Sequence, residues 1–290
     1  MNTFFYQLMT GFAMGANVFL VAAGLSLIFG VLNVVNFAHA TFYLLAVYLT
    51  YTVTATFGAN SFWLALILAP LAVAILGAII EITMFRRVYD KIPYIQLIVA
   101  WGLILMLGDG FKLIWGSDKR AIPTPDLLMG GVPIPGGTFP VYLLFSMGIA
   151  AVMAIMLYFL LYRTKLGLYV RAARQDPLIT RTLAINVDNL FTLVFALACW
   201  LGGLGGVVAS PMTPAVLGMD MEIIFTAFII VIVGGMGSVI GSLVGSLIYG
   251  LVNALGILVL PRLPMVFLYA IMVLILIFRP YGLLGKPQLR

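Results

Sequence analysis

Long apolar stretches separated by short polar breaks follow one another along almost the whole chain. They fall at residues 4–29, 38–57, 62–85, 93–116, 141–162, 190–210, 223–233, 239–260 and 264–278. Several approach the ~20 residues that a helix needs to cross the hydrocarbon core of a bilayer. The strands of an outer-membrane barrel would show a weaker, alternating pattern instead. The pattern therefore predicts an all-α, polytopic transmembrane helix bundle of about 8 to 9 spans.

One apolar stretch is too short to cross a membrane alone. The run at 223–233 has only 11 residues and leads into Gly234, Gly235 and Gly237, where helix propensity is poor. We therefore expect a half-helix, or a short tilted span broken by glycine, at this point.

Composition agrees with a membrane protein. The chain is 64% hydrophobic and 8% charged, with a mean hydropathy of +1.20, whereas about a quarter of the residues in soluble domains are charged. The N-terminal stretch has no basic residue before its apolar run and no small-residue cleavage pattern after it, so we expect no removable signal peptide.

The basic residues indicate the orientation of the chain. They gather in three clusters: Arg86, Arg87 and Lys91; Arg163, Lys165, Arg171, Arg174 and Arg181; and Arg279, Lys286 and Arg290. The positive-inside rule puts these clusters in the cytoplasm. The other loops, poorer in positive charge, carry Lys119, Arg120, Asp220, Glu222 and Arg262. The N-terminus is then outside and the C-terminus inside, which requires an odd number of spans, most simply nine. Because this rule accounts for the net charge of +6, we expect no nucleic-acid partner.

The predicted outside loop at 116–140 is rich in residues that stop helices. It contains five of the 14 prolines and five glycines, which favour turns. We expect an irregular external cap, which serves either as a connection or as a docking surface.

Several kinds of chemistry are missing from the sequence. No ATP-binding P-loop motif occurs, and His39 is the only histidine, so we predict no enzyme activity, no metal site and no cofactor. Glu81, Asp109 and Lys112 lie in apolar stretches, where ion-coupled transporters keep ionisable groups. Glu81 is close enough to the basic cluster at 86–91 to reach the interface, and Asp109 and Lys112 have the spacing of an intrahelical pair. We favour a structural role for all three.

The segment "KLGLYVRAARQDPLITRTLAIN" at 165–186 is the most polar part of the chain. Its apolar and basic residues fall on separate faces at helical spacing. Asp176 is a preferred N-cap and Pro177 a preferred first helical residue, so we predict one helix ending near Gln175 and a second beginning at Pro177. The alternative is a basic amphipathic segment that rests on anionic lipid, although such a helix needs no capped turn.

Two further patterns bear on the interior. Asn33, Asn36 and His39 follow at spacings of three, which predicts one polar stripe on a helix. The stripe either lines a translocation path, if the chain is a transporter, or satisfies backbone groups where the helix breaks near Gly30. The glycines at 237, 241 and 245 repeat at spacing four, which favours close helix packing.

Three motif stretches stand out together. The first is "GLYVRAARQDPLITRTLAIN" with the nearby Asp188; the second is "GLSLIFGVLNVVNFAHATFYLLAVY" at 24–48; the third is "VGGMGSVIGSLVGSLIYG" with "FRPYGLLG" at the C-terminal end. In this order they resemble the signatures of permease subunits of branched-chain amino acid ABC importers, the LivH type, over nearly the whole chain. Two positions depart from the family pattern: Ala40 and Thr41 stand where the family usually has Gly-Glu, and Ala184 replaces a common glycine.

The resemblance implies a single permease domain, 1–290, in the cytoplasmic (inner) membrane of a bacterium or archaeon. Two permease subunits, the second a homologous but different chain, would pair within the membrane lipid. Two separate ATPase subunits would bind beneath, and an extracytoplasmic binding protein would deliver substrate. The loop at 163–188 would then be the coupling segment that contacts the ATPase, through Gly167, Arg171, Ala172, Gln175 and Asp176.

The expected substrates are branched-chain or other hydrophobic amino acids. A same-family permease for urea or short amides is the main alternative. A self-contained secondary amino acid transporter and a passive channel stay open as other classes.

Overall fold

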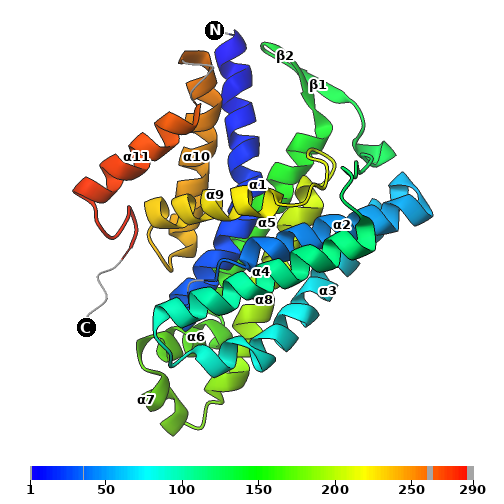
Figure 1. Ribbon diagram of the computed structural model, residues 1–290. Coiled ribbons are helices and arrows are strands. Elements are labelled where there is room, and N and C mark those ends of the chain that lie inside the picture. The colour runs from blue at the N-terminus through cyan, green and yellow to red at the C-terminus, as the bar shows by residue number, and fades with distance from the viewer. Residues whose placement is uncertain (1, 35, 260–263, 286–290) are drawn as a thin grey trace.

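The computed structural model describes residues 2–34, 36–259 and 264–285, and Figure 1 shows that helices dominate it. The helices are α1 Asn2–Leu32, α2 His39–Phe57, α3 Phe62–Thr83, α4 Pro93–Trp115, α5 Val141–Arg163, α6 Lys165–Gln175, α7 Pro177–Thr182, α8 Val187–Ala209, α9 Met219–Gly234, α10 Val239–Val259 and α11 Pro264–Phe278. Short 3-10 turns are η1 Ala59–Ser61, η2 Phe85–Val88 and η3 Asp126–Leu128, and the strands are β1 Gly131–Ile134 and β2 Gly137–Pro140. The predicted all-α membrane bundle is confirmed. Arg262, Lys286 and Arg290, assigned above to loops, lie outside the described residues.

Each of the nine apolar stretches forms a helix, but they differ in length. Seven helical segments of the described chain are long and apolar enough to cross a membrane. The two others are α9, of 16 residues, and α11, of 15. The short helix expected at 223–233 is therefore confirmed as α9, which ends where Gly235 takes a φ of 107°. In Figure 1 this helix runs across α1 rather than along it.

The first helix is the centre of the bundle. Phe19, Leu20 and Ile28 of α1 are completely buried, and α1 packs mainly against α10 and α8. Close packing between α9 and α10 depends on the predicted glycine repeat. A Cβ on Gly241 would lie 2.3 Å from the Gly234 carbonyl oxygen, and one on Gly245 would lie 2.5 Å from that of Ile230. The packing role predicted for these glycines is confirmed.

The prediction of one polar helical stripe at 33–39 is wrong. The helix α1 continues past Gly30 and ends at Leu32, and α2 begins only at His39. The side chain of His39 then contacts the carbonyl oxygen of Val21. Val21 lies 11 residues before the end of α1, which is about 16 Å back along the helix at 1.5 Å per residue. Asn33 therefore lies in the connection just after α1, whereas His39 is the first residue of α2.

The loop predicted to be external is more regular than expected. Its strands β1 and β2 pair antiparallel, with Gly131 opposite Pro140 and Ile134 opposite Gly137. The ring of Phe139 packs edge-on against Tyr6, at 5.9 Å between centroids, and so fixes the hairpin to the start of α1. The hairpin and the α6–α7 segment lie at opposite ends of the molecule in Figure 1, as the loop assignment requires.

The ionisable residues of the apolar stretches are arranged differently from the expected pairing. Asp109 and Lys112 are exposed on α4, and among the described residues no ion pair within 4.0 Å joins them, so the predicted pair does not form. Glu81 is buried within the bundle. Its side chain is 0% exposed, and Arg86 turns inward to form the ion pair at 3.0 Å.

Candidate functional site

Two hydrogen bonds to polar side chains set the shape of the α6–α7 segment. The amide of Gly167 donates to the Thr164 hydroxyl at the start of α6, at 3.2 Å. The amide of Ile179 donates to the carboxylate of Asp176 at the start of α7, at 3.0 Å. Pro177 occupies the first turn of α7, where its missing N–H costs nothing. The predicted helix end at Gln175 and helix start at Pro177 are confirmed.

The inner face of α6 holds the segment against the bundle. Gly167, Val170 and Ala173 are its buried residues, and α6 packs on α5, α1 and α8. A Cβ on Gly167 would lie 2.1 Å from the carbonyl oxygen of Leu161. Because no side chain fits there, Gly167 lets α6 fold back tightly against the end of α5.

The apolar residues of the α7 region face outwards instead. Leu178, Ile179 and Leu183 are 74%, 61% and 67% exposed. We call these three residues the α7 tip. It lies at the end of the molecule that carries α6 with its basic residues Lys165, Arg171 and Arg174, and Figure 1 shows α7 projecting from that end. Neighbouring apolar residues exposed outside a predicted membrane span are typical of a surface that binds another protein or the membrane.

The residues predicted to contact an ATPase differ in their surroundings. Gly167 is buried and Ala172 is half-buried, whereas Gln175 is exposed. Arg171 turns back towards α5, where it donates to the Leu161 carbonyl and lies over the Tyr162 ring. Asp176 uses one oxygen to cap α7. Their role in docking stays a prediction, and the structure adds the α7 tip, which the sequence reasoning did not single out as a contact surface.

Parts of the three motif stretches meet beside Gly237, in the turn between α9 and α10. A Cβ on Gly237 would lie 2.7 Å from the Cα of Gly30 and 2.9 Å from Nη2 of Arg174. Nη1 of Arg174 donates to the Gly237 carbonyl, at 3.1 Å. We call the contact among Gly30, Arg174 and Gly237 the glycine junction. It ties α6 to α1 and to the turn before α10.

The C-terminal motif completes the same region. The amides of Leu283 and Leu284 donate to the carbonyls of Val233 and Gly234, at 2.9 and 3.0 Å. These bonds hold the "FRPYGLLG" stretch against the end of α9. Segments that are far apart in the sequence thus form one contiguous structure at the end that carries α6 and α7.

Two of the three residues predicted to line the translocation path are buried within the protein. Asn33 is exposed, with a φ of 55°, whereas Asn36 and His39 are 0% exposed. Oδ1 of Asn36 accepts from the amide of Ala38 at 3.0 Å, and Nε2 of His39 lies 3.1 Å from the Val21 carbonyl. Among the described residues, Nδ2 of Asn36 and Nδ1 of His39 have no hydrogen-bond partner. A path-lining role for the three residues stays a prediction.

Sequence reasoning missed a polar network on the basic side. Glu81 accepts hydrogen bonds from Arg86 at 3.0 Å, Tyr89 at 2.9 Å and Thr192 at 2.7 Å. The network joins α3 and the η2 turn to α8. Glu81 and Arg86 are five residues apart, which is not a helical pair spacing, and Thr192 is distant in the sequence, so no local pattern could have revealed it.

A second missed contact lies towards the other end. The hydroxyl of Thr41, one of the two residues that depart from the family signature at 38–41, donates to the buried carboxylate of Asp220 at 2.8 Å. This bond links the first turn of α2 to the first turn of α9. Within the described ranges, no group of three or more His, Cys, Asp or Glu side chains could hold a metal ion.

Comparisons with known proteins give a consistent result. A family model described as "Branched-chain amino acid transport system / permease component" matches residues 7–276. The permease protein BraD of a high-affinity branched-chain amino acid transport system in Pseudomonas aeruginosa is 28% identical, with 97% of this chain and 96% of the relative covered. LivH of Escherichia coli K12 is 27% identical, covering 98% and 96%, and a probable LivH of Methanocaldococcus jannaschii is 28% identical, covering 92% and 88%. No solved structure matches the chain significantly.

Proposed function

The chain belongs to the family of branched-chain amino acid transport system permease components, and we propose that it is the membrane-spanning subunit of an ATP-driven importer. In this proposal it forms the translocation path together with a second, homologous permease chain. Two ATPase subunits supply the energy, and an extracytoplasmic binding protein delivers a branched-chain or other hydrophobic amino acid. The membrane is the cytoplasmic membrane of a bacterium or archaeon.

The observation that carries the proposal is the exposed α7 tip. Three neighbouring apolar side chains exposed at the basic end of a membrane protein are unfavourable in water unless another protein or a lipid surface covers them. The caps at Thr164 and Asp176 fix the direction of α7, so the tip is a shaped surface rather than a flexible tail. A cleft on an ATPase subunit is the partner we assign to it.

The glycine junction supports a route from this surface to the membrane helices. Arg174 of α6 is bonded to Gly237, and Gly237 touches Gly30 of α1. A displacement of α6 therefore acts directly on the inner end of α1 and on the turn before α10. Since packed interfaces shift between discrete arrangements, movement of an ATPase could open or close a path between the helices in this way.

Reconstitution in liposomes tests the proposal. The chain is reconstituted with its homologous permease, with or without the two ATPase subunits, ATP and the binding protein, and the uptake of radiolabelled leucine is measured. We expect uptake only when all components and ATP are present. Uptake by the chain alone, driven by a proton or sodium gradient, or flux without any energy source, would contradict it.

The identity of the substrate is tested separately on the binding protein. Calorimetric titration with leucine, isoleucine, valine and urea compares the two substrate classes directly. We expect an amino acid to bind, because the relatives are named for branched-chain amino acid transport. Binding of urea alone would assign the chain to the amide-transporting alternative.

A further inference from the structure

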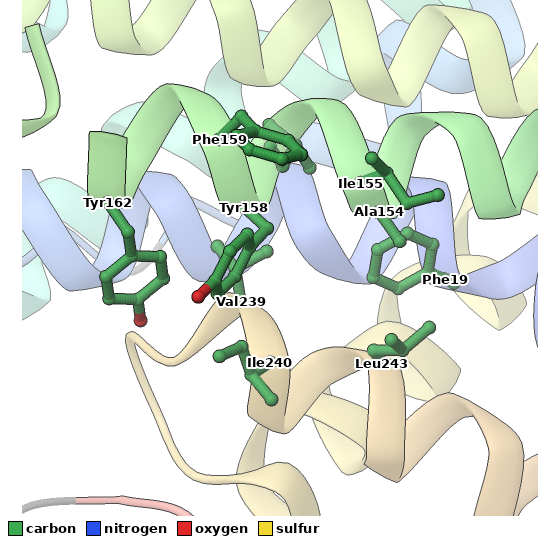
Figure 2. A pocket seen from close by; sticks show the side chains of 10 residues that line it. Phe19, Ala154, Ile155, Tyr158, Phe159, Tyr162, Val239, Ile240 and Leu243 are labelled. Atoms are coloured by element: carbon green, nitrogen blue, oxygen red, sulfur yellow. The ribbon is translucent and has the colours of Figure 1, made fainter. Parts of the chain in front are cut away.

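An apolar cavity of about 340 Å³ lies between α5, α10 and α1. Tyr158 and Tyr162 extend from α5 towards α10, where Ile240 and Leu243 lie opposite them, with Phe19 behind (Figure 2). The cavity is open on one side. Most of α5 is not buried by the rest of this chain. Because α5 is a candidate membrane span, we take the opening to face the apolar interior of the membrane.

A smaller and more polar cavity of about 80 Å³ adjoins it on the side of α6. The two cavities share Tyr162 and Val239 among their lining residues. The second cavity is also lined by Ser26, Arg171 and Arg174. The apolar groove thus lies next to a cavity lined by two arginines.

The polar groups in the smaller cavity have hydrogen-bonding capacity left over. Arg171 donates to the Leu161 carbonyl and Arg174 to the Gly237 carbonyl, which are neutral partners. No carboxylate of the described residues lies within 4.0 Å of either guanidinium. Ser26 is 0% exposed, and its hydroxyl has no hydrogen-bond partner within the part of the chain that the structure describes. Two positive charges and an unpaired buried hydroxyl together fit an anion.

We propose that the paired cavities bind one anionic phospholipid. Its phosphate contacts Arg171, Arg174 and the hydroxyl of Ser26, and an acyl chain lies in the groove between α5 and α10. Guanidinium groups are well suited to phosphate oxygens. Basic pockets between membrane helices on the cytoplasmic side are a known mode of binding anionic headgroups. The tyrosines at 158 and 162 suit this depth, since tyrosine is enriched at the membrane interface.

The lining residues disfavour an amino acid substrate at this place. Neither cavity is lined by Asp or Glu, so nothing with negative charge would pair with the ammonium group of an amino acid. The residues from Ala154 to Tyr162 extend along the groove for about 12 Å at 1.5 Å per residue, more than one leucine side chain fills. A phospholipid with a net negative headgroup needs no carboxylate partner, and its acyl chain is long enough to fill the groove.

Native mass spectrometry of the purified full-length chain tests the proposal. The protein is delipidated in detergent and then mixed with equal amounts of phosphatidylglycerol and phosphatidylcholine of the same acyl composition. We expect one tightly bound phosphatidylglycerol. The double variant Arg171→Gln/Arg174→Gln should retain it about tenfold less, since charge-assisted hydrogen bonds to the phosphate are lost. Leu243→Trp, which fills the apolar groove, should also reduce retention.

Matched controls separate this site from general membrane binding. Arg87 is an exposed basic residue outside both cavities, and Ile75 is an exposed apolar residue of α3, so Arg87→Gln and Ile75→Trp should leave retention unchanged. Melting temperatures in detergent identify any variant that is misfolded. Retention unchanged in a folded double variant, or equal retention of phosphatidylcholine, would overturn the proposal.

Two other occupants give distinct results. Inorganic phosphate that displaces phosphatidylglycerol at millimolar concentration would assign a free-anion site and overturn the lipid site. If Leu243→Trp abolished assembly with the second permease but left lipid retention unchanged, the groove would be a helix-docking surface, which also overturns it. Lipid loss with assembly intact is the result the proposal requires.

Discussion

The carboxylate of Asp176 lies 3.0 Å from the amide nitrogen of Ile179 and accepts its hydrogen bond. This contact begins α7 directly after α6 ends and holds the α7 tip in one orientation. A side chain that looked suited to contacting another protein thus has an internal structural task as well.

The capping contact makes Asp176 variants informative. Asp176→Asn keeps a good N-cap, whereas Asp176→Ala removes it at a local cost of about 1 kcal/mol. If Asp176 acts through the cap, ATP hydrolysis stimulated by the binding protein falls in the alanine variant and is largely kept in the asparagine variant. Hydrolysis measured in the reconstituted transporter decides this. Equal loss in both variants would show instead that the negative charge contacts the ATPase.

Removal of the Glu81 carboxylate should destabilise the bundle. Glu81→Gln leaves Arg86 without its ion-pair partner, and because Arg86 is 31% exposed we expect a cost of about 2 kcal/mol, below the range for fully buried pairs. Reversible unfolding in detergent and denaturant measures the free energy of unfolding.

The exposed ion pair between Arg181 and Asp188, at 2.6 Å, provides the control. Asp188→Asn should change stability by less than about 1 kcal/mol, since exposed pairs contribute little. An equal effect of the two substitutions would argue that Glu81 does not join α3 to α8.

The glycine junction should not tolerate a side chain. Gly237→Ala forces alanine into a φ of 77° and against Gly30 and Arg174, for a combined cost of about 2–4 kcal/mol. Gly148→Ala is the matched control, since nothing lies within 4 Å of a Cβ there. It should cause no loss of stability in a thermal melt. A fully stable Gly237→Ala protein would contradict the packing at the junction.

Replacement of Ala184 by glycine should stabilise the protein. Its φ of 60° is left-handed and costs an L-residue roughly 1–2 kcal/mol, partly offset by the backbone entropy that glycine loses on folding. We expect Ala184→Gly to raise the free energy of unfolding by about 0.5–1 kcal/mol. In contrast, Ala151→Gly in the helical interior of α5 should lower it by about 1 kcal/mol.

The sequence predicted well those features that depend on local chemistry. The apolar stretches locate the long helices, because crossing a bilayer requires length and hydrophobicity in one continuous segment. The turn at Asp176-Pro177 was predictable since a cap and a proline act within a few residues. The short α9 helix follows from the glycines after Val233.

Other features depend on tertiary contacts and stay hidden in a single sequence. Asn33, Asn36 and His39 have helical spacing, and Gly30 marks a possible break, but spacing alone does not show that α1 ends at Leu32 and that α2 begins only at His39. The Glu81 network requires Thr192 from another helix. The outward direction of the α7 tip follows from how α6 packs on α5, since amphipathic spacing alone does not tell which face is covered.

The central claim is that the α7 tip couples this chain to an ATPase, and the double variant Leu178→Asp/Leu183→Asp tests it most directly. Both side chains are exposed, so the variant should fold and insert normally. Asn189→Asp, an exposed change at the start of α8, controls for added negative charge. Binding of the purified ATPase subunits to the permease in nanodiscs is measured, together with ATP hydrolysis stimulated by the binding protein. The account predicts at least a tenfold loss of ATPase affinity, about 1.4 kcal/mol or more, and loss of stimulation in the double variant alone; wild-type affinity and stimulation would contradict it.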